Sequence, residues 1–238
     1  MTILTLRDSA FLRNIGWSDP YYSNVSLLLH GDGINGSTTI IDNSPSPKTV
    51  TAFGNAQIST AQSKFGGASL AFDGNGDYLT LGDVSSQLLL SGDFTIECFV
   101  RFNSLSTFQS ICQTVWNSGG FFLFHHLDYQ NKISFYVWNH NSAAPLLTQS
   151  SSMAINTFYH VAVTRAGSTF RLFVNGELES STTSAATITL PLQYAGIYRD
   201  PSFFLYGLNG YIDELRITKG IARYTSNFTP PTAPFPDF

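Results

Sequence analysis

Apolar and polar residues alternate with a period of two in several segments of this chain. The segment 94–102 shows the pattern most clearly, since one set of alternate positions is entirely apolar: Phe94, Ile96, Cys98, Val100 and Phe102. Successive side chains of a strand point to opposite faces of a sheet, so this alternation predicts a strand with one buried face. Further strands are predicted at 25–30, 68–72, 78–81, 110–115, 120–126, 133–139, 195–198 and 208–217, with an edge strand at 49–58.

The strongest local signal lies at 158–179. Two alternating runs are separated by Ala166-Gly167-Ser168, and the second run ends at Asn175-Gly176. Asn-Gly is a preferred pair for a two-residue hairpin turn because both turn residues need positive φ. We therefore expect three short antiparallel strands joined by two tight turns.

Composition supports an all-β fold. Aromatic residues make up 14% of the 238 residues and charged residues only 12%, which suits strands better than long amphipathic helices. About twelve short strands separated by turn residues predict a large antiparallel β-sandwich. The sandwich is expected at residues 25–228, between an N-terminal arm (1–24) and a Pro-rich C-terminal tail (229–238).

The arm fits neither a helical nor a strand period. Three interpretations are open: an arm packed on the domain's own edge, an arm docked on a neighbouring subunit, or a disordered segment. If the arm docks on another subunit, the contacting side chains are expected to be Phe11, Leu12, Trp17, Tyr21 and Tyr22.

Charge and hydropathy exclude several classes of function. The net charge is −4 and the lysines are scattered, so no basic patch supports nucleic-acid binding. No apolar run approaches the ~18 residues of a membrane span, and the N-terminus lacks the apolar core of a signal peptide. We expect a chain made in the cytoplasm without membrane insertion. The two cysteines, Cys98 and Cys112, form no disulfide framework, and both free and bridged thiols are open interpretations.

Several segments, taken in order, resemble one family: the laminin-G-like domains of the concanavalin A-like lectin and glucanase superfamily. They are LLLHGDG (27–33), SLAFDGNGDYLTLG (69–82), SGDFTIECFVRF (91–102), FYHVAVTRAGSTFRLFVNGELE (158–179) and GYIDELRITKGIARY (210–224). The resemblance implies a concanavalin A-like jelly roll of two antiparallel sheets. Such domains bind glycans, bind proteins or serve as scaffolds, so the resemblance implies fold more directly than function. KFGGASLAFDG and IDELRITKGIARYTSNFTPP look similar to versions found in tailed-phage virion proteins.

Catalysis is not expected. Glucanases of this superfamily carry closely spaced carboxylates on one strand, where a nucleophile and a general acid act on one sugar bond. The matching strand here carries Glu97 alone, and Glu97 is expected to pair with an arginine across strands. The sequence also lacks a Gly-x-Ser-x-Gly nucleophile motif and a histidine spacing suited to zinc.

Two acidic features fit a calcium ion. Asp73 and Asp77 lie in a Gly-rich loop that begins like an EF-hand, although the alternative is a turn in which the Asp side chains cap backbone amides. Asp213 falls where the resemblance implies a structural calcium ligand, with backbone oxygens near Asp32 and Gly74 completing the site. No cofactor is required for the predicted function. The acidic residues predict a structural calcium ion as the one bound group.

Glycan binding would need aromatic rings for stacking and polar side chains for the sugar hydroxyls. Candidates gather near one rim: Trp116, Asn117, Tyr136, Trp138, Asn139 and His140. Tyr136 and Trp138 share a face, but aromatic residues at this spacing also suit a core.

We therefore predict a non-enzymatic virion protein, either a capsid decoration or a tail or fibre component. Its low charge, its aromatic content and its two ends outside the sandwich indicate contacts with other virion proteins and with copies of itself. A lectin-like module that binds a host-surface glycan is the alternative, and a glycoside hydrolase is the third interpretation.

Overall fold

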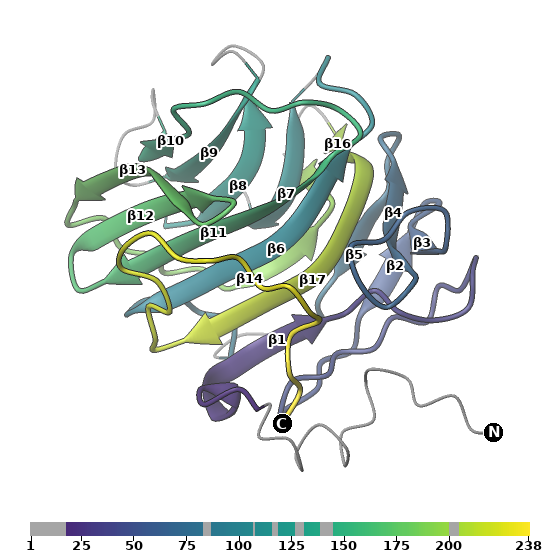
Figure 1. Cartoon of the computed structure of the whole chain (residues 1–238), viewed down its shortest axis with the longest axis horizontal. Coiled ribbons are helices and arrows are strands. Elements are labelled where there is room, and N and C mark those ends of the chain that lie inside the picture. Colours follow the sequence, from purple (N-terminus) through teal and green to yellow (C-terminus); the bar gives the residue numbers. More distant parts are fainter. Residues whose placement is uncertain are drawn as a thin grey trace.

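The chain forms a sandwich of two antiparallel sheets, which confirms the predicted all-β fold (Figure 1). The computed structural model describes residues 18–82, 87–106, 108–115, 119–126, 131–138, 145–199 and 205–238. Within them, the one helical element is a short 3-10 helix, η1 (Tyr22–Asn24).

The larger sheet, called sheet A, has eight strands and lies in front in Figure 1. In spatial order they are β13 (Glu177–Thr183), β12 (Thr169–Val174), β11 (Phe158–Ala166), β6 (Phe94–Phe102), β17 (Asn209–Lys219), β4 (Ser69–Asp73) and β3 (Gln57–Ser59), with β1 (Val25–Leu29) also paired to β17. Along β17 the neighbour therefore changes from β4 to β1. The change falls near Glu214, whose φ of 55° accompanies a break in the register with β6.

The second sheet, called sheet B, has seven strands. In spatial order they are β10 (Leu147–Thr148), β9 (Lys132–Val137), β8 (Phe121–His126), β7 (Gln109–Thr114), β14 (Leu192–Ala195), β5 (Tyr78–Thr80) and β2 (Thr51–Phe53). A separate pair joins β15 (Ile197–Arg199) to β16 (Leu205–Gly207).

The apolar core lies between the two sheets. The five alternate residues of β6, from Phe94 to Phe102, belong to it with no exposed surface, as the sequence pattern predicted. Cys98 from sheet A and Cys112 from sheet B are buried in the same cluster as free thiols. Burial raises the pKa of the Cys112 thiol to about 12, so it stays protonated at neutral pH and packs as an apolar group.

The expected hairpins at 158–179 are confirmed. Strands β11, β12 and β13 pair in succession, and the turn between the last two has φ values of 49° at Asn175 and 81° at Gly176. Both turn residues thus occupy the left-handed region that a type I′ turn requires.

The single edge strand predicted at 49–58 is wrong. The segment forms two strands, β2 and β3, which belong to different sheets. Gly54 breaks it with a φ of 67°, and the Asp77 carboxylate accepts the amide of Asn55 at 2.6 Å. A loop contact distant in sequence therefore turns the chain from one sheet to the other.

Candidate functional site

The outer face of sheet A carries a buried cluster of charges around Glu97. Arg216 is the cross-strand partner of Glu97 on β17 and donates to its Oε1 from Nε (2.9 Å) and Nη2 (2.8 Å). The other oxygen, Oε2, lies 3.2 Å from His160 Nε2 and accepts the Tyr224 hydroxyl at 2.9 Å. The expected arginine pairing of Glu97 is therefore confirmed.

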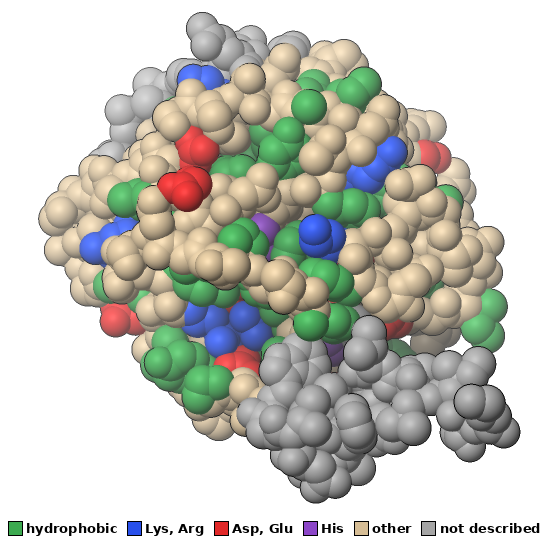
Figure 2. Space-filling model, viewed as in Figure 1, with side chains coloured by type: hydrophobic (Ala, Val, Ile, Leu, Met, Phe, Trp, Pro, Cys, Tyr) green, Lys and Arg blue, Asp and Glu red, His purple; other side chains and the backbone are tan. Residues whose placement is uncertain are grey.

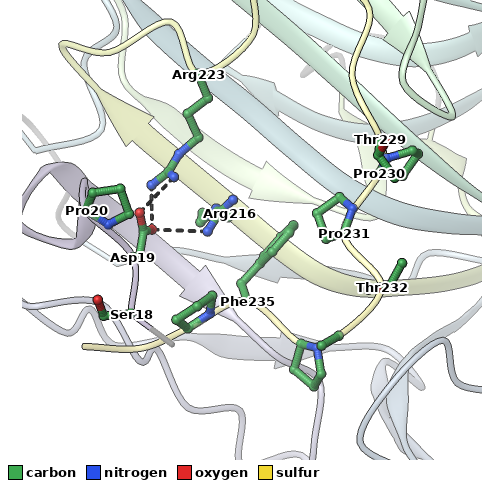
Figure 3. A pocket seen from close by; sticks show the side chains of 13 residues that line it. Ser18, Asp19, Pro20, Arg216, Arg223, Thr229, Pro230, Pro231, Thr232 and Phe235 are labelled. Carbon is green, nitrogen blue, oxygen red and sulfur yellow. Dashed lines mark hydrogen bonds and ion pairs between the residues drawn. The ribbon is translucent and has the colours of Figure 1, made fainter. Parts of the chain in front are cut away.

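Both ends of the described chain cover this cluster. Figure 3 shows Asp19 between Arg216 and Arg223, which donate to its carboxylate at distances of 2.6 to 3.1 Å. The C-terminal residues cross the outer face of sheet A, and the Asp19 amide donates to the Phe238 backbone oxygen at 3.1 Å (Figure 1). Figure 2 shows basic and acidic side chains gathered beside this crossing segment.

The Pro-rich tail is packed on its own domain. Phe235 is only 3% exposed and joins Val25, Leu28 and Phe99 in a small apolar cluster outside the main core. The Arg216 guanidinium lies 3.7 Å from the centre of the Phe235 ring, and the Phe235 amide donates to Glu214. The sequence suggested an end outside the sandwich, whereas the structure uses it as a cover for one sheet.

Glu97 is unsuited to acid–base catalysis in this arrangement. Burial would by itself raise the pKa of this carboxyl, but the Arg216 charge and the His160 contact outweigh it and hold the pKa well below its usual range. The side chain has no exposed surface, and both of its oxygens are engaged. A glucanase would need an accessible pair of carboxylates, one of them able to donate a proton.

The four predicted metal ligands fall into two pairs. Asp73 and Asp77 form one, and their oxygens accept backbone amides: Asp77 those of Asn55 and Asp73, and Asp73 that of Asn75. This is the capped-turn alternative. Among the described residues, no group of three or more His, Cys, Asp or Glu side chains is placed to hold a metal.

Asp32 and Asp213 form the second pair, beside the turn at 64–67. Asp213 Oδ2 accepts the amides of Lys64 (2.6 Å) and Phe65 (3.0 Å), while its buried Oδ1 has no hydrogen-bond partner among the described residues. The Asp32 carboxylate occupies the space that a β-carbon at Gly66 would fill. Burial, with the nearby charges of Glu214 and Asp32, raises the pKa of Asp213 to about 8. A buried, unbonded carboxylate oxygen beside a second carboxylate fits a hard cation such as calcium.

The predicted glycan residues are only partly described. Trp116, Asn117, Asn139 and His140 lie outside the described residues. Tyr136 and Trp138 do share a face, the outer face of sheet B, where both pack against Phe122 at ring-centre distances of 5.4 and 6.4 Å. They form a cluster separate from the core between the sheets.

A second aromatic cluster on the same face was missed by sequence reasoning. The Phe53 and Tyr78 rings stack with centres 4.6 Å apart, and Tyr194 meets Tyr78 edge-on at 6.0 Å. Phe53 is 41% exposed. The rings come from β2, β5 and β14, so only the strand order brings them together. Within the described strands of sheet B, Lys132 is the only Lys, Arg, Asp or Glu.

Of the predicted assembly residues, Tyr21 and Tyr22 are described, and Phe11, Leu12 and Trp17 lie outside the described residues. The Tyr22 hydroxyl donates to the Asn43 backbone oxygen at 2.7 Å, and its ring packs on the Phe235 cluster. Tyr21 is 41% exposed beneath the Arg223 guanidinium. Tyr22 thus serves the domain itself, while Tyr21 keeps an accessible face.

The fold is an antiparallel β-sandwich. Glu97, the carboxylate on the strand that matches the catalytic strand of glucanases, is engaged in structural contacts. The profile of the concanavalin A-like lectin/glucanases superfamily matches residues 73–222, and the chain belongs to this superfamily. No curated protein matches the chain.

Among solved structures, the chain is similar to botulinum neurotoxin binding domains. The serotype C1 binding domain aligns with a TM-score of 0.62 and 16% identity, over 84% of this chain and 50% of that one. The neurotoxin DC binding domain in complex with rat synaptotagmin II gives 0.62 and 17%, over 84% and 49%. A type C structure described as interacting with two ganglioside molecules gives 0.61 and 17%, over 88% and 50%. The chain spans about half of these structures, and at this identity the likeness concerns the fold alone.

In the described part of the chain, no helix has the length and apolar character needed to cross a membrane.

Proposed function

We propose that this chain is a non-enzymatic surface module of a virion, a capsid decoration or a tail or fibre component, which acts by binding other proteins. The observation that carries the proposal is the outer face of sheet B, where two aromatic clusters lie on strands almost free of charge. Interface cores are enriched in aromatic residues and depleted of charged ones. The virion setting is supported by the sequence segments similar to tailed-phage virion proteins.

The contrast between the sheets supports this assignment. Sheet A buries the charges around Glu97 inside contacts made by the chain's own ends, so this part of its outer face is already covered. On sheet B, Phe53 and the half-buried Tyr194 lie on the outer face of strands that carry almost no charged residues in the described part of the chain. The similar neurotoxin domains are binding domains by their descriptions, one of them in complex with a protein, which agrees with a binding role.

The experiment compares two aspartate substitutions at equally exposed apolar positions. Phe53 on sheet B and Leu178 on sheet A are each 41% exposed. We expect Phe53→Asp to lower incorporation into purified particles at least tenfold, measured by quantitative mass spectrometry against the shell protein. Leu178→Asp, the control, is expected to leave incorporation unchanged. Thermal unfolding should first establish that both variants fold. Equal incorporation of both, or absence of the chain from particles, would overturn the proposal.

The alternative is a carbohydrate-binding module that uses the Trp138 region. It is favoured by the Tyr136 and Trp138 rings, which lie 6.2 Å apart on one face. A glycan array would show binding that Trp138→Ala removes, with particle incorporation unaffected. Release of sugar from any bound glycan would instead support the hydrolase.

We also propose that Asp32 and Asp213 hold a structural calcium ion. Their carboxylates would supply two of the oxygen ligands, and backbone oxygens and water the others. The support is the buried Asp213 Oδ1 and the two carboxylates beside the turn at 64–67. Such an ion would neutralise this acidic pair and fix the turn.

A further inference from the structure

Four asparagine residues of the chain are each followed directly by glycine: Asn35, Asn75, Asn175 and Asn209. In such a pair the glycine nitrogen can attack the side-chain carbon of the asparagine, because glycine has no side chain to hinder the approach. Asparagine is a chemically labile residue for this reason. The four dipeptides are identical, so a large difference in their reactivity in the folded protein must come from the structure around them.

The first pair is held by the backbone of β3 and the residue after it. The Gly36 amide, which would have to attack, donates to the Ile58 backbone oxygen at 2.8 Å. The side chain that it would attack is also engaged, since Asn35 Oδ1 accepts the Thr60 amide at 3.0 Å. Both reacting groups of this pair are therefore fixed by other partners.

Two further pairs are fixed through the asparagine side chain. Asn175 lies in the turn between β12 and β13, and its Oδ1 accepts the His160 amide at 2.9 Å. Asn209 lies in β17, and its Oδ1 accepts Asn103 Nδ2 at 3.2 Å. The glycine after Asn209 pairs with both β4 and β6. Neither side chain can turn toward the following nitrogen without losing a hydrogen bond.

The pair Asn75-Gly76 differs from the other three. It lies in the loop that leads from β4 in sheet A to β5 in sheet B (Figure 1). The Asn75 side chain is exposed, and within the described part of the chain neither this side chain nor the Gly76 amide makes a hydrogen bond. A β-carbon added at Gly76 would meet no atom within 4 Å, so the space around it is open. Both reacting groups are thus free, and water has access to them.

The rest of this loop is held without help from the Asn75 side chain. Asp77 Oδ2 accepts the Asp73 amide at 2.6 Å, and Asp73 Oδ1 accepts the Asn75 amide at 2.7 Å. These contacts fix the backbone on either side of the reactive pair. The loop therefore keeps its shape while the Asn75 side chain changes its rotamer, and no unfolding is needed before it reacts.

We propose that Asn75 is a site of spontaneous deamidation in the folded protein, with water as the co-reactant. The Gly76 nitrogen forms a bond to Asn75 Cγ, the bond from Cγ to Nδ2 breaks, and Nδ2 leaves as ammonia with the proton of the Gly76 amide. Water then opens the cyclic imide at either of its carbonyl carbons. One opening gives aspartate, and the other gives isoaspartate, in which the main chain runs through the former side-chain carbon.

The reaction changes both the charge and the backbone of this loop. Either product places a new carboxylate between Asp73 and Asp77, and isoaspartate also lengthens the backbone of the turn. Asp77 accepts the Asn55 amide as well, at the point where the chain passes from β2 to β3. Tyr78, the next residue, stacks on Phe53 in the aromatic cluster of sheet B. The change therefore falls beside this cluster, although the reaction does not depend on the virion function.

The test follows all four asparagines in the same full chain. Purified protein is incubated at mildly alkaline pH, with and without urea, and its peptides are mapped by mass spectrometry for the mass gain of an amide-to-acid conversion. In the folded chain Asn75 should convert at least tenfold faster than each of the other three. In urea the four should convert at rates within a few-fold of one another, because no fold protects any of them.

Asn75→Gln is the matched variant, since it keeps the amide but the longer side chain closes the imide ring far more slowly. It should remove the fast phase of ammonia release from the folded protein. Isoaspartyl methyltransferase should label the incubated wild-type chain at position 75 and leave this position of the variant unlabelled. Equally slow conversion of all four asparagines in the folded chain, or fastest conversion at another position, would overturn the proposal. Conversion at position 75 without isoaspartate would refute the attack by Gly76.

Discussion

The two halves of the outer face of sheet A use the same strands in opposite ways. In the closed half, Glu97 of β6 faces Arg216 of β17 beneath the chain's own ends. In the open half, Arg101 of β6 faces Tyr211 of β17 beside a polar hollow. The side chains in both rows are outward-facing cross-strand pairs, so the strands themselves do not explain the difference.

What differs is the cover. Residues 18–24 and the tail lie over the closed half, and burial there requires every charge to be paired. The bulge near Glu214 separates the halves, because β1 replaces β4 as the neighbour of β17 at that point. The same sheet face therefore provides rigidity at one end and an accessible polar surface at the other.

The largest expected effect on stability comes from removing the arginine of the closed half, compared with removing the arginine of the open half. Arg216→Ala should lower the free energy of unfolding by about 3–5 kcal/mol, since it removes the guanidinium that donates twice to the buried Glu97 and once to the buried Asp19. Arg101→Ala, the matched control, should change it by less than about 1 kcal/mol because Arg101 is partly exposed. Urea unfolding of the two variants checks the comparison, and equal losses would break it.

The next effect concerns the cover itself. Phe235→Ala should reduce stability by about 3 kcal/mol, because the ring fills a small apolar cluster and shields Arg216. Hydrogen exchange should then rise at the backbone amides of positions 19 and 235, while those of β4 keep their protection. Unchanged exchange at these two amides would show that the tail does not hold the closed half shut.

Much of the fold could be predicted from local pattern. Alternation identified the buried face of β6, and Asn175-Gly176 identified the hairpin, because both signals depend on neighbouring residues alone. The pairing of Glu97 with an arginine followed from the absence of a second carboxylate on its strand face.

The sites depended on information that local pattern does not carry. A polar hollow lies beside Tyr211 because the small residue Ala71 is placed between Tyr211 and Gln57 in the strand register, and that register joins residues far apart in sequence. The tail was predicted to lie outside the sandwich because proline disfavours strands. The apolar Phe235 among those prolines was the signal that this end packs on the domain. The break at Gly54 likewise depends on Asp77.

Acid should weaken the closed half selectively. The pKa of Glu97 is held below its usual value of 4.5, so its stabilising effect is present above that pH and is lost as pH falls below it. The expected loss is about 2 kcal/mol near pH 3. His160, Tyr224, Arg216 and Arg223 face this carboxylate, and Asp19 shares the arginines.

Urea unfolding between pH 7 and pH 3 measures this loss, with Glu97→Gln as the comparison. The variant starts less stable, and its unfolding free energy should fall less steeply below pH 4.5 because position 97 no longer titrates. Identical slopes for both proteins would show that other carboxyl groups account for the acid sensitivity.

The smallest expected effect lies at the boundary between the halves, where Asp213 precedes the bulge. Calcium at ten times its dissociation constant should stabilise the protein by about 1.4 kcal/mol, because it binds a carboxylate pair that exists only in the folded chain. Asp213→Asn should abolish this shift, whereas Asp73→Asn, in the capped turn, should keep it. Thermal unfolding with calcium or a chelator provides the measurement. If Asp73→Asn alone lost the response, the ion would belong to the open half; if calcium changed nothing, the bulge would be held by hydrogen bonds without an ion.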